Sequence, residues 1–237
     1  MLFWAIAAGG AASVGLGRDW LGVASRAALV PTWFLAVYLV VAALAPLAVA
    51  GWRRWGWATV AVGLAGAGLV DLTSLTTAWE GFGWLNVLVV WVTVHQLGIA
   101  WQARRLTPSV AGAITVVGLA GLLILVGPEG YAVSMVGVDG FGIDNTNPPR
   151  VTLVLLGLVQ AGVTGLLRHR LAGLVQRPAV RSASLLVNAH LMTIYLWHLT
   201  ALGLTTAVCL WAGGVGLRAR PDTAARWWSR PRRGSPS

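Results

Sequence analysis

The stretch LVPTWFLAVYLVVAALAPLAVAG, residues 29–51, decides the fold class, because it runs for 23 residues without a charged side chain. A helix needs about 20 mostly apolar residues to cross the hydrocarbon core of a bilayer. Six further stretches qualify: 1–17, 57–77, 83–101, 108–127, 151–167 and 183–212. The first and sixth of the seven are short, and the last is long enough to tilt or to extend beyond the bilayer. The sequence therefore predicts an all-α, polytopic membrane bundle of about seven transmembrane helices.

The composition of the whole chain agrees with this prediction. Of its 237 residues, 57% are hydrophobic and 10% are charged, against roughly 25% charged residues in an ordinary soluble domain. The mean hydropathy is +0.74, and the chain holds 30 Gly and 14 Trp. Membrane helices tolerate Gly and collect Trp at the lipid head groups. These values argue strongly against a water-soluble fold.

The net charge of +10 comes from 17 basic residues, all of them Arg, against 7 acidic ones. Nucleic-acid binding needs a basic stripe on a soluble face, whereas these Arg residues lie in short loops, so no nucleic-acid partner is expected. The connections 52–56, 102–107 and 168–181 hold eight Arg, and the opposite loops hold three. The positive-inside rule places the Arg-rich connections in the cytoplasm. The Arg/Pro-rich polar tail, 218–237, would then lie outside, against the same rule, so we expect a further span or a non-crossing segment near the end.

Motifs of soluble enzymes are absent from the sequence. There is no G-x-S-x-G elbow, Walker A loop or H-E-x-x-H helix. One cysteine, Cys209, excludes an intrachain disulfide and a CxxC site. Chemistry must then come from polar side chains within the spans, each of which costs roughly 2.5–3.5 kcal/mol to insert.

The last span carries the strongest candidates. At 100° per residue, Asn188, Tyr195 and His198 fall on one helix face, whereas His190 points almost the opposite way. A histidine suits proton removal from a hydroxyl because its pKa lies near the operating pH. His198 is therefore the first candidate for a catalytic base, with Tyr195 and Asn188 orienting the substrate, and acyl transfer to an alcohol fits this chemistry.

Other candidates lie earlier in the chain. In the fourth span, His95 shares a stripe with Trp91, whose indole could shape a pocket beside the imidazole. His95 is the second catalytic candidate. Asp71, near one end of the third span, is a candidate substrate contact, and a solvated, cap-like role is at least as probable. For each polar residue, interhelical hydrogen bonding worth about 0.6–2 kcal/mol is an equal alternative.

Two further groups of residues outside the spans are candidates for ligand contacts. The loop 128–150 mixes turn residues with apolar ones, and we expect it to be ordered, with Tyr131, Val133, Met135 and Val136 buried. Asn145 in this loop is a candidate contact for substrate hydroxyls. Arg53 and Arg54 lie between tryptophans, and besides marking topology they could bind an anionic head group or a nucleotide phosphate.

Four segments resemble the integral-membrane acyltransferase 3 family. PTWFLAVYLVVAALAPL at 31–47 is similar to that family's Trp-Phe-Leu-x-x-Tyr helix, and WLNVLVVWVTVHQLGIAW at 84–101 to its His-Gln-Leu-Gly helix. YAVSMVGVDGFGIDNTNPP at 131–149 resembles a loop of one subgroup. MTIYLWHLTAL at 192–202 resembles a late Tyr-Leu-x-His helix. The resemblance covers roughly residues 29–217 and occurs in the family's order.

The resemblance implies an enzyme that transfers an acyl group, often acetyl, from cytoplasmic acyl-CoA to a hydroxyl of a carbohydrate or similar acceptor across the membrane. It implies acyl-CoA as co-substrate, with no bound cofactor and no metal, in the plasma membrane of a bacterium. The family's early Arg and His pair has no counterpart here. The chain is therefore expected to be the C-terminal portion of such an enzyme, with residues 1–217 forming an incomplete transmembrane domain.

Two other functions fit the residues. A transporter or flippase of small polar or lipid-linked substrates is one, but the chain shows no repeated halves. The other is a catalytically incomplete remnant or partner subunit, which needs no active residue.

Overall fold

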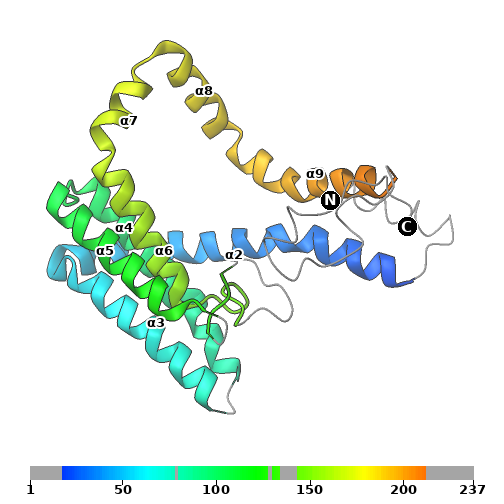
Figure 1. Ribbon diagram of the computed structural model, residues 1–237, viewed down its shortest axis with the longest axis horizontal. Helices are drawn as coiled ribbons and strands as arrows, with labels where there is room; N and C mark the ends of the chain where they lie inside the picture. The colour runs from blue at the N-terminus through cyan, green and yellow to red at the C-terminus, as the bar shows by residue number, and fades with distance from the viewer. Residues whose placement is uncertain (1–17, 78–79, 128–129, 134–142, 212–237) are drawn as a thin grey trace, which may run out of the picture. The chain divides into compact units, whose positions relative to one another are not determined.

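The computed structural model describes residues 18–77, 80–127, 130–133 and 143–211. They form α2 (Arg18–Trp55), α3 (Ala58–Thr76), the 3₁₀ helix η1 (Glu80–Leu85), α4 (Asn86–Gln102), α5 (Pro108–Leu125), α6 (Val151–Leu166), α7 (Arg168–Val175), α8 (Pro178–Ala189) and α9 (Leu191–Trp211) (Figure 1). These described residues contain isolated β-bridges but no strand. The prediction of an all-α fold is confirmed.

Four of these helices are long and apolar enough to cross a membrane: Trp33–Trp55, Ala58–Thr76, Gly81–Gln102 and Pro108–Leu125. A fifth span exists if α6 and α7, bent by 67° at their junction, are taken together. Large apolar side chains point outward from them, and Leu123 and Ile124 are each 81% exposed. Such a surface suits lipid, so the chain is a multi-pass, all-α membrane bundle.

The count of about seven spans is not reached in the described part of the chain. The first expected span, 1–17, lies outside the described residues, and α6 alone has 16 residues. The expected span over 183–212 is interrupted at His190, between α8 and α9. There the Leu186 carbonyl faces both the backbone N–H of His190, at 3.1 Å, and its ring Nδ1, at 2.9 Å. A side chain that competes for a helix carbonyl loosens the turn at that point.

The chain divides into two compact units, each described here by itself. One comprises residues 32–182, and the other combines residues 1–31 with 183–237. The expected boundary before the tail 218–237 lies outside the described residues. In the first unit α5 packs on α6, α3 on α4, and α4 on α6, so that these four helices form a bundle (Figure 1).

Glycine allows the closest approach within this bundle. A Cβ atom on Gly162 of α6 would lie 2.6 Å from the carbonyl oxygen of Ala111 on α5, and one on Gly118 of α5 would lie 2.7 Å from that of Leu155. Small residues let membrane helices pack backbone to backbone, which substitutes for a hydrophobic driving force that lipid does not supply.

Two apolar clusters fill the bundle, one toward each end. The first contains Trp52, Val60, Leu97, Ala100, Leu106, Ala111, Leu155 and Leu158, and the second contains Ala67, Val90, Tyr131, Val151 and Val154. The Arg-rich connections 52–56 and 102–107 meet at the first cluster, where the Arg168 guanidinium also lies 5.8 Å from the Trp101 ring centroid. The first two Arg-rich connections and the start of the third, at Arg168, therefore share one end of the bundle, as their assignment to one side of the membrane requires.

Candidate functional site

A buried carboxylate, Asp71 of α3, is the centre of the main polar cluster in the first unit. It is 2% exposed. Its Oδ1 accepts hydrogen bonds from Asn86 Nδ2 at 2.8 Å and from the Arg150 guanidinium at 3.3 Å. Its Oδ2 accepts from the Tyr131 hydroxyl at 3.0 Å and from the Val151 backbone N–H at 2.8 Å. The alternative of a solvated, cap-like role for Asp71 is wrong, because α4, α6 and the 128–150 loop enclose it.

Arg150 forms the ion pair that makes this burial possible. It lies directly before α6 and is 8% exposed, and its guanidinium also donates to the Ser74 hydroxyl at 2.9 Å. A carboxylate has about four lone-pair sites on its two oxygens. All four of those on Asp71 are occupied by protein donors. The arrangement favours interhelical hydrogen bonding over substrate contact for Asp71.

Tyr131 connects the loop to the same carboxylate. It is buried, as predicted, and Ala132 beside it is buried too, whereas Val133 is 83% exposed, so the prediction for Val133 is wrong. Met135 and Val136 lie outside the described residues. Burial of the Tyr131 phenol, aided by the negative charge of Asp71, raises its pKa above its usual range. The phenol therefore remains a neutral hydrogen-bond donor to Asp71.

Asn145 holds the two ends of the same loop together. It is fully buried; its amide Nδ2 donates to the Ala132 carbonyl at 2.7 Å, and its Oδ1 accepts from the Thr152 hydroxyl at 2.6 Å. Its backbone carbonyl also accepts from the Arg150 N–H at 3.0 Å. Contact between Asn145 and a substrate hydroxyl would require this loop to open.

The Asn145→Ala variant is expected to lower the free energy of unfolding by about 1–3 kcal/mol, because it leaves buried partners unsatisfied. The loop should also become more sensitive to protease. Thermal unfolding and limited proteolysis of the full chain in detergent measure both effects. Asn147→Ala is the matched control, since Asn147 is exposed in the same loop. Equal effects of the two substitutions would contradict this structural role for Asn145.

His95 and Trp91 lie one helical turn apart on α4, as the stripe predicts. His95 is partly buried and has no hydrogen-bond partner among the described residues. The Trp91 ring lies 6.2 Å from the ring of Trp33 on α2, and its indole Nε1 is buried with no partner in the described part of the chain. No polar group among the described residues therefore fixes the imidazole.

Tyr195 and His198 lie together on α9, in the second unit. Their ring centroids are 5.2 Å apart with 36° between the planes, and the His198 Nδ1 contacts the Tyr195 backbone carbonyl oxygen. Asn188 belongs to α8, beyond the interruption at His190. The prediction that Asn188 shares a face of one continuous helix with this pair is therefore wrong. Of the catalytic candidates, His95 belongs to the first unit and His198 to the second.

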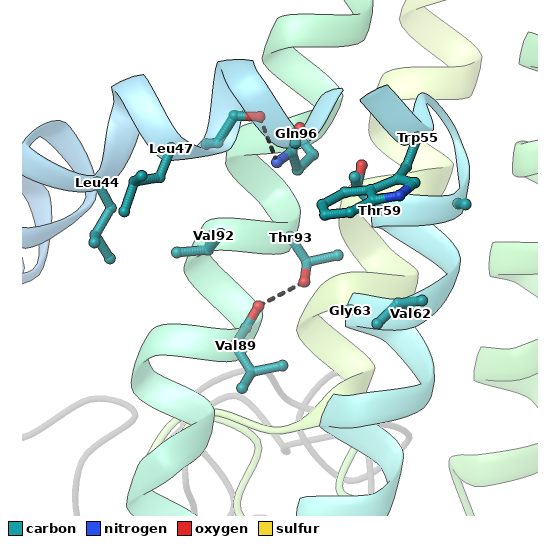
Figure 2. A pocket seen from close by; sticks show the side chains of 13 residues that line it. Leu44, Leu47, Trp55, Thr59, Val62, Gly63, Val89, Val92, Thr93 and Gln96 are labelled. Carbon is teal, nitrogen blue, oxygen red and sulfur yellow. Dashed lines mark hydrogen bonds between the residues drawn. The ribbon is translucent and has the colours of Figure 1, made fainter. Parts of the chain in front are cut away.

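A groove in the first unit lies among α2, α3 and α4 (Figure 2). Its volume is about 630 Å³, and it is lined by Leu44, Leu47, Ala48, Gly51, Trp55, Ala58, Thr59, Val62, Gly63, Val89, Val92, Thr93 and Gln96. His95 is not among these residues, although its neighbour Gln96 is. Among the described residues no group of three or more His, Cys, Asp or Glu could hold a metal ion.

Sequence reasoning missed the pairing of Asp71 with Arg150 and the position of the buried Gln96 in the wall of the groove. The signal for the first was present, because a buried acid within a span needs a cationic partner. Among the three Arg residues of the Arg-poor loops, Arg150 is the one directly before an apolar span. No comparable signal identifies Gln96. A groove between helices depends on the angle at which they cross, and the sequence pattern does not specify that angle.

The fold and these sites define a multi-pass α-helical membrane protein with a buried ion pair and an apolar groove. Comparison of the chain with protein-family models, curated proteins and solved structures finds no match.

Proposed function

We propose that the chain is the membrane-embedded part of an acyl-CoA-dependent O-acyltransferase. It would transfer an acyl group, most simply acetyl, to a hydroxyl of a carbohydrate or similar acceptor at a bacterial plasma membrane. The four segments that resemble the acyltransferase 3 family support this proposal. The observation that carries it is the arrangement of His198 and Tyr195 on α9.

This arrangement suits His198 to act as a base. A backbone carbonyl only accepts hydrogen bonds, so the contact with Tyr195 O suits the neutral imidazole tautomer that carries its proton on Nδ1. The lone pair is then on Nε2, the ring nitrogen that can take a proton from a substrate. His198 is exposed, which leaves Nε2 accessible, and the adjacent Tyr195 ring restricts rotation of the imidazole.

The proposed reaction balances without a cofactor. Nε2 of His198 removes the proton of the acceptor hydroxyl while the hydroxyl oxygen bonds to the thioester carbonyl carbon. The carbon–sulfur bond then breaks, and the CoA sulfur leaves with the electron pair and takes the proton from the imidazolium. The products are an ester and the CoA thiol, and the imidazole returns to its starting state.

Incubation of the full chain in detergent with radiolabelled acetyl-CoA and a panel of hydroxyl acceptors tests the proposal. Covalent transfer of label is expected, and His198→Ala should lower the rate by about 100-fold or more, as loss of a general base does. His169→Ala is the matched control, because His169 is an exposed histidine on another helix, α7. It should leave the rate unchanged.

Three results would overturn the proposal. They are the absence of transfer by a folded preparation, an unchanged rate in His198→Ala, and substrate flux into liposomes without covalent product. The last of these would favour the transporter.

A further inference from the structure

The short helix α7 follows α6 at a bend of 67° and runs away from the bundle (Figure 1). All of its residues, 168–175, are exposed. In the described part of the chain, only α6 has backbone close to that of α7. Helix α7 therefore presents its side chains to the surroundings of the bundle and not to its core.

The sequence of α7, RHRLAGLV, gives the helix an apolar face with cationic edges. At 100° per residue, Leu171, Leu174 and Val175 fall within an arc of about 100°. These three side chains are 38%, 43% and 46% exposed. Arg168 and Arg170 lie at the two edges of the arc. A helix with an apolar face and Arg beside it is typical of those that lie in the plane of a membrane interface.

A contact between Arg168 and Trp101 indicates the depth at which α7 begins. The Arg168 guanidinium lies 5.8 Å from the ring centroid of Trp101, at the end of α4, and Trp101 is 41% exposed. Exposed tryptophans of membrane helices lie at the level of the lipid head groups. Arg150 and Arg168 flank α6 and are 18 residues apart, or about 27 Å along a helix, close to the roughly 30 Å of the hydrocarbon core. Helix α7 therefore starts at the membrane surface.

The alternative placement of α7, as the second half of a broken span, is unfavourable. It would carry the charges of Arg168 and Arg170 into hydrocarbon, where charged side chains are costly to insert. In the interface, by contrast, long Arg side chains reach the head groups while neighbouring apolar side chains stay among the acyl chains. The charges on α7 therefore favour the interface.

The charge at this end of the bundle suits an anionic partner. The three Arg-rich connections 52–56, 102–107 and 168–181 hold eight Arg and no acidic residue. The sequence has no Asp or Glu between Asp144 and Asp222, so residues near α7 along the chain do not neutralise its Arg. Anionic phospholipids attract basic segments at the membrane surface and supply the missing negative charge.

We infer that α7 is an interfacial helix that binds anionic phospholipids of the leaflet at the Arg-rich end. Leu171, Leu174 and Val175 enter the boundary between head groups and acyl chains, and Arg168 and Arg170 pair with lipid phosphates. This inference does not depend on the proposed acyl transfer, because it concerns a surface of the first unit and no substrate.

Fluorescence quenching by lipids with brominated acyl chains tests the placement of α7. The full chain with Cys209→Ser receives one new cysteine, by Leu171→Cys or His169→Cys, and each variant is labelled with an environment-sensitive fluorophore and reconstituted into vesicles. The two positions lie about 160° apart around the helix. Quenching should be about twofold or more stronger at position 171, because the apolar face of an interfacial helix is immersed. Equal quenching at both positions, as a broken span would give, or no quenching at position 171 would overturn the inference.

The same label at Leu171 tests the preference for anionic lipid. Brominated phosphatidylglycerol should quench it about twofold or more strongly than brominated phosphatidylcholine at the same mole fraction, because anionic lipid collects beside the Arg. Arg170→Gln with Arg177→Gln should remove this preference. Arg104→Gln with Arg105→Gln removes the same charge from the connection between α4 and α5, and the preference should largely remain. Equal quenching by the two lipids in the unaltered background, or equal effects of the two Arg pairs, would overturn the assignment to α7.

Discussion

Arg150→Gln is expected to lower the free energy of unfolding by about 3–5 kcal/mol, the usual cost of removing one partner of a buried ion pair. The substitution leaves the Asp71 carboxylate enclosed at 2% exposure without its cation. It also removes the guanidinium that donates to the Ser74 hydroxyl. Asn86, Tyr131 and the Val151 N–H would still donate to Asp71, but none of them carries a compensating charge.

Unfolding of the full chain in detergent, followed by circular dichroism, measures this loss. Arg105→Gln is the control, since Arg105 is exposed, and it should change the stability by no more than about 0.5 kcal/mol. Adding Asp71→Asn to Arg150→Gln should restore part of the stability, because the buried charge is then gone. A double variant less stable than Arg150→Gln alone would contradict the ion pair as the source of the effect, as a double-mutant cycle separates it.

The positions of the bundle helices could be predicted from sequence because the bilayer sets the length of an apolar run. The predicted spans 57–77 and 108–127 correspond to Ala58–Thr76 and Pro108–Leu125. The start of the span 108–127 is also indicated by the residues at that point. Pro108 occupies its first turn, and the Thr107 hydroxyl accepts from the Val110 N–H at 3.4 Å. Both are residue types that favour helix starts.

The tertiary pairings could not be read from the same pattern. Asp71 and Arg150 are 79 residues apart, and hydropathy does not specify which helix ends meet. The interruption at His190 was missed for a related reason: the apolar run continues through it, and the competing contact is between one ring nitrogen and one carbonyl. The placement of Tyr195 and His198 within one turn follows from helix periodicity alone. The placement of Asn188 on the same face required a continuous helix.

Gly162→Ala is expected to destabilise the bundle by about 1–3 kcal/mol, the typical cost of overpacking a tight contact. The added methyl group would lie 2.6 Å from the Ala111 carbonyl oxygen and would also meet the Thr115 side chain. The Thr115 hydroxyl is held by its hydrogen bond to the same carbonyl, at 2.8 Å. Since the carbonyl belongs to helix backbone, α5 and α6 can relieve the clash only by moving apart.

Gly112→Ala on α5 separates this packing effect from the effect of glycine on helix stability. A Cβ at Gly112 meets nothing within 4 Å, so alanine there should be neutral or stabilising by up to about 1 kcal/mol, through helix propensity. Unfolding of both variants in the same detergent compares them directly. Because alanine improves the intrinsic propensity at both positions, a loss confined to Gly162→Ala must come from the α5–α6 contact. Equal stability of the two variants would mean that α5 and α6 do not pack so closely at Gly162 that only glycine fits there.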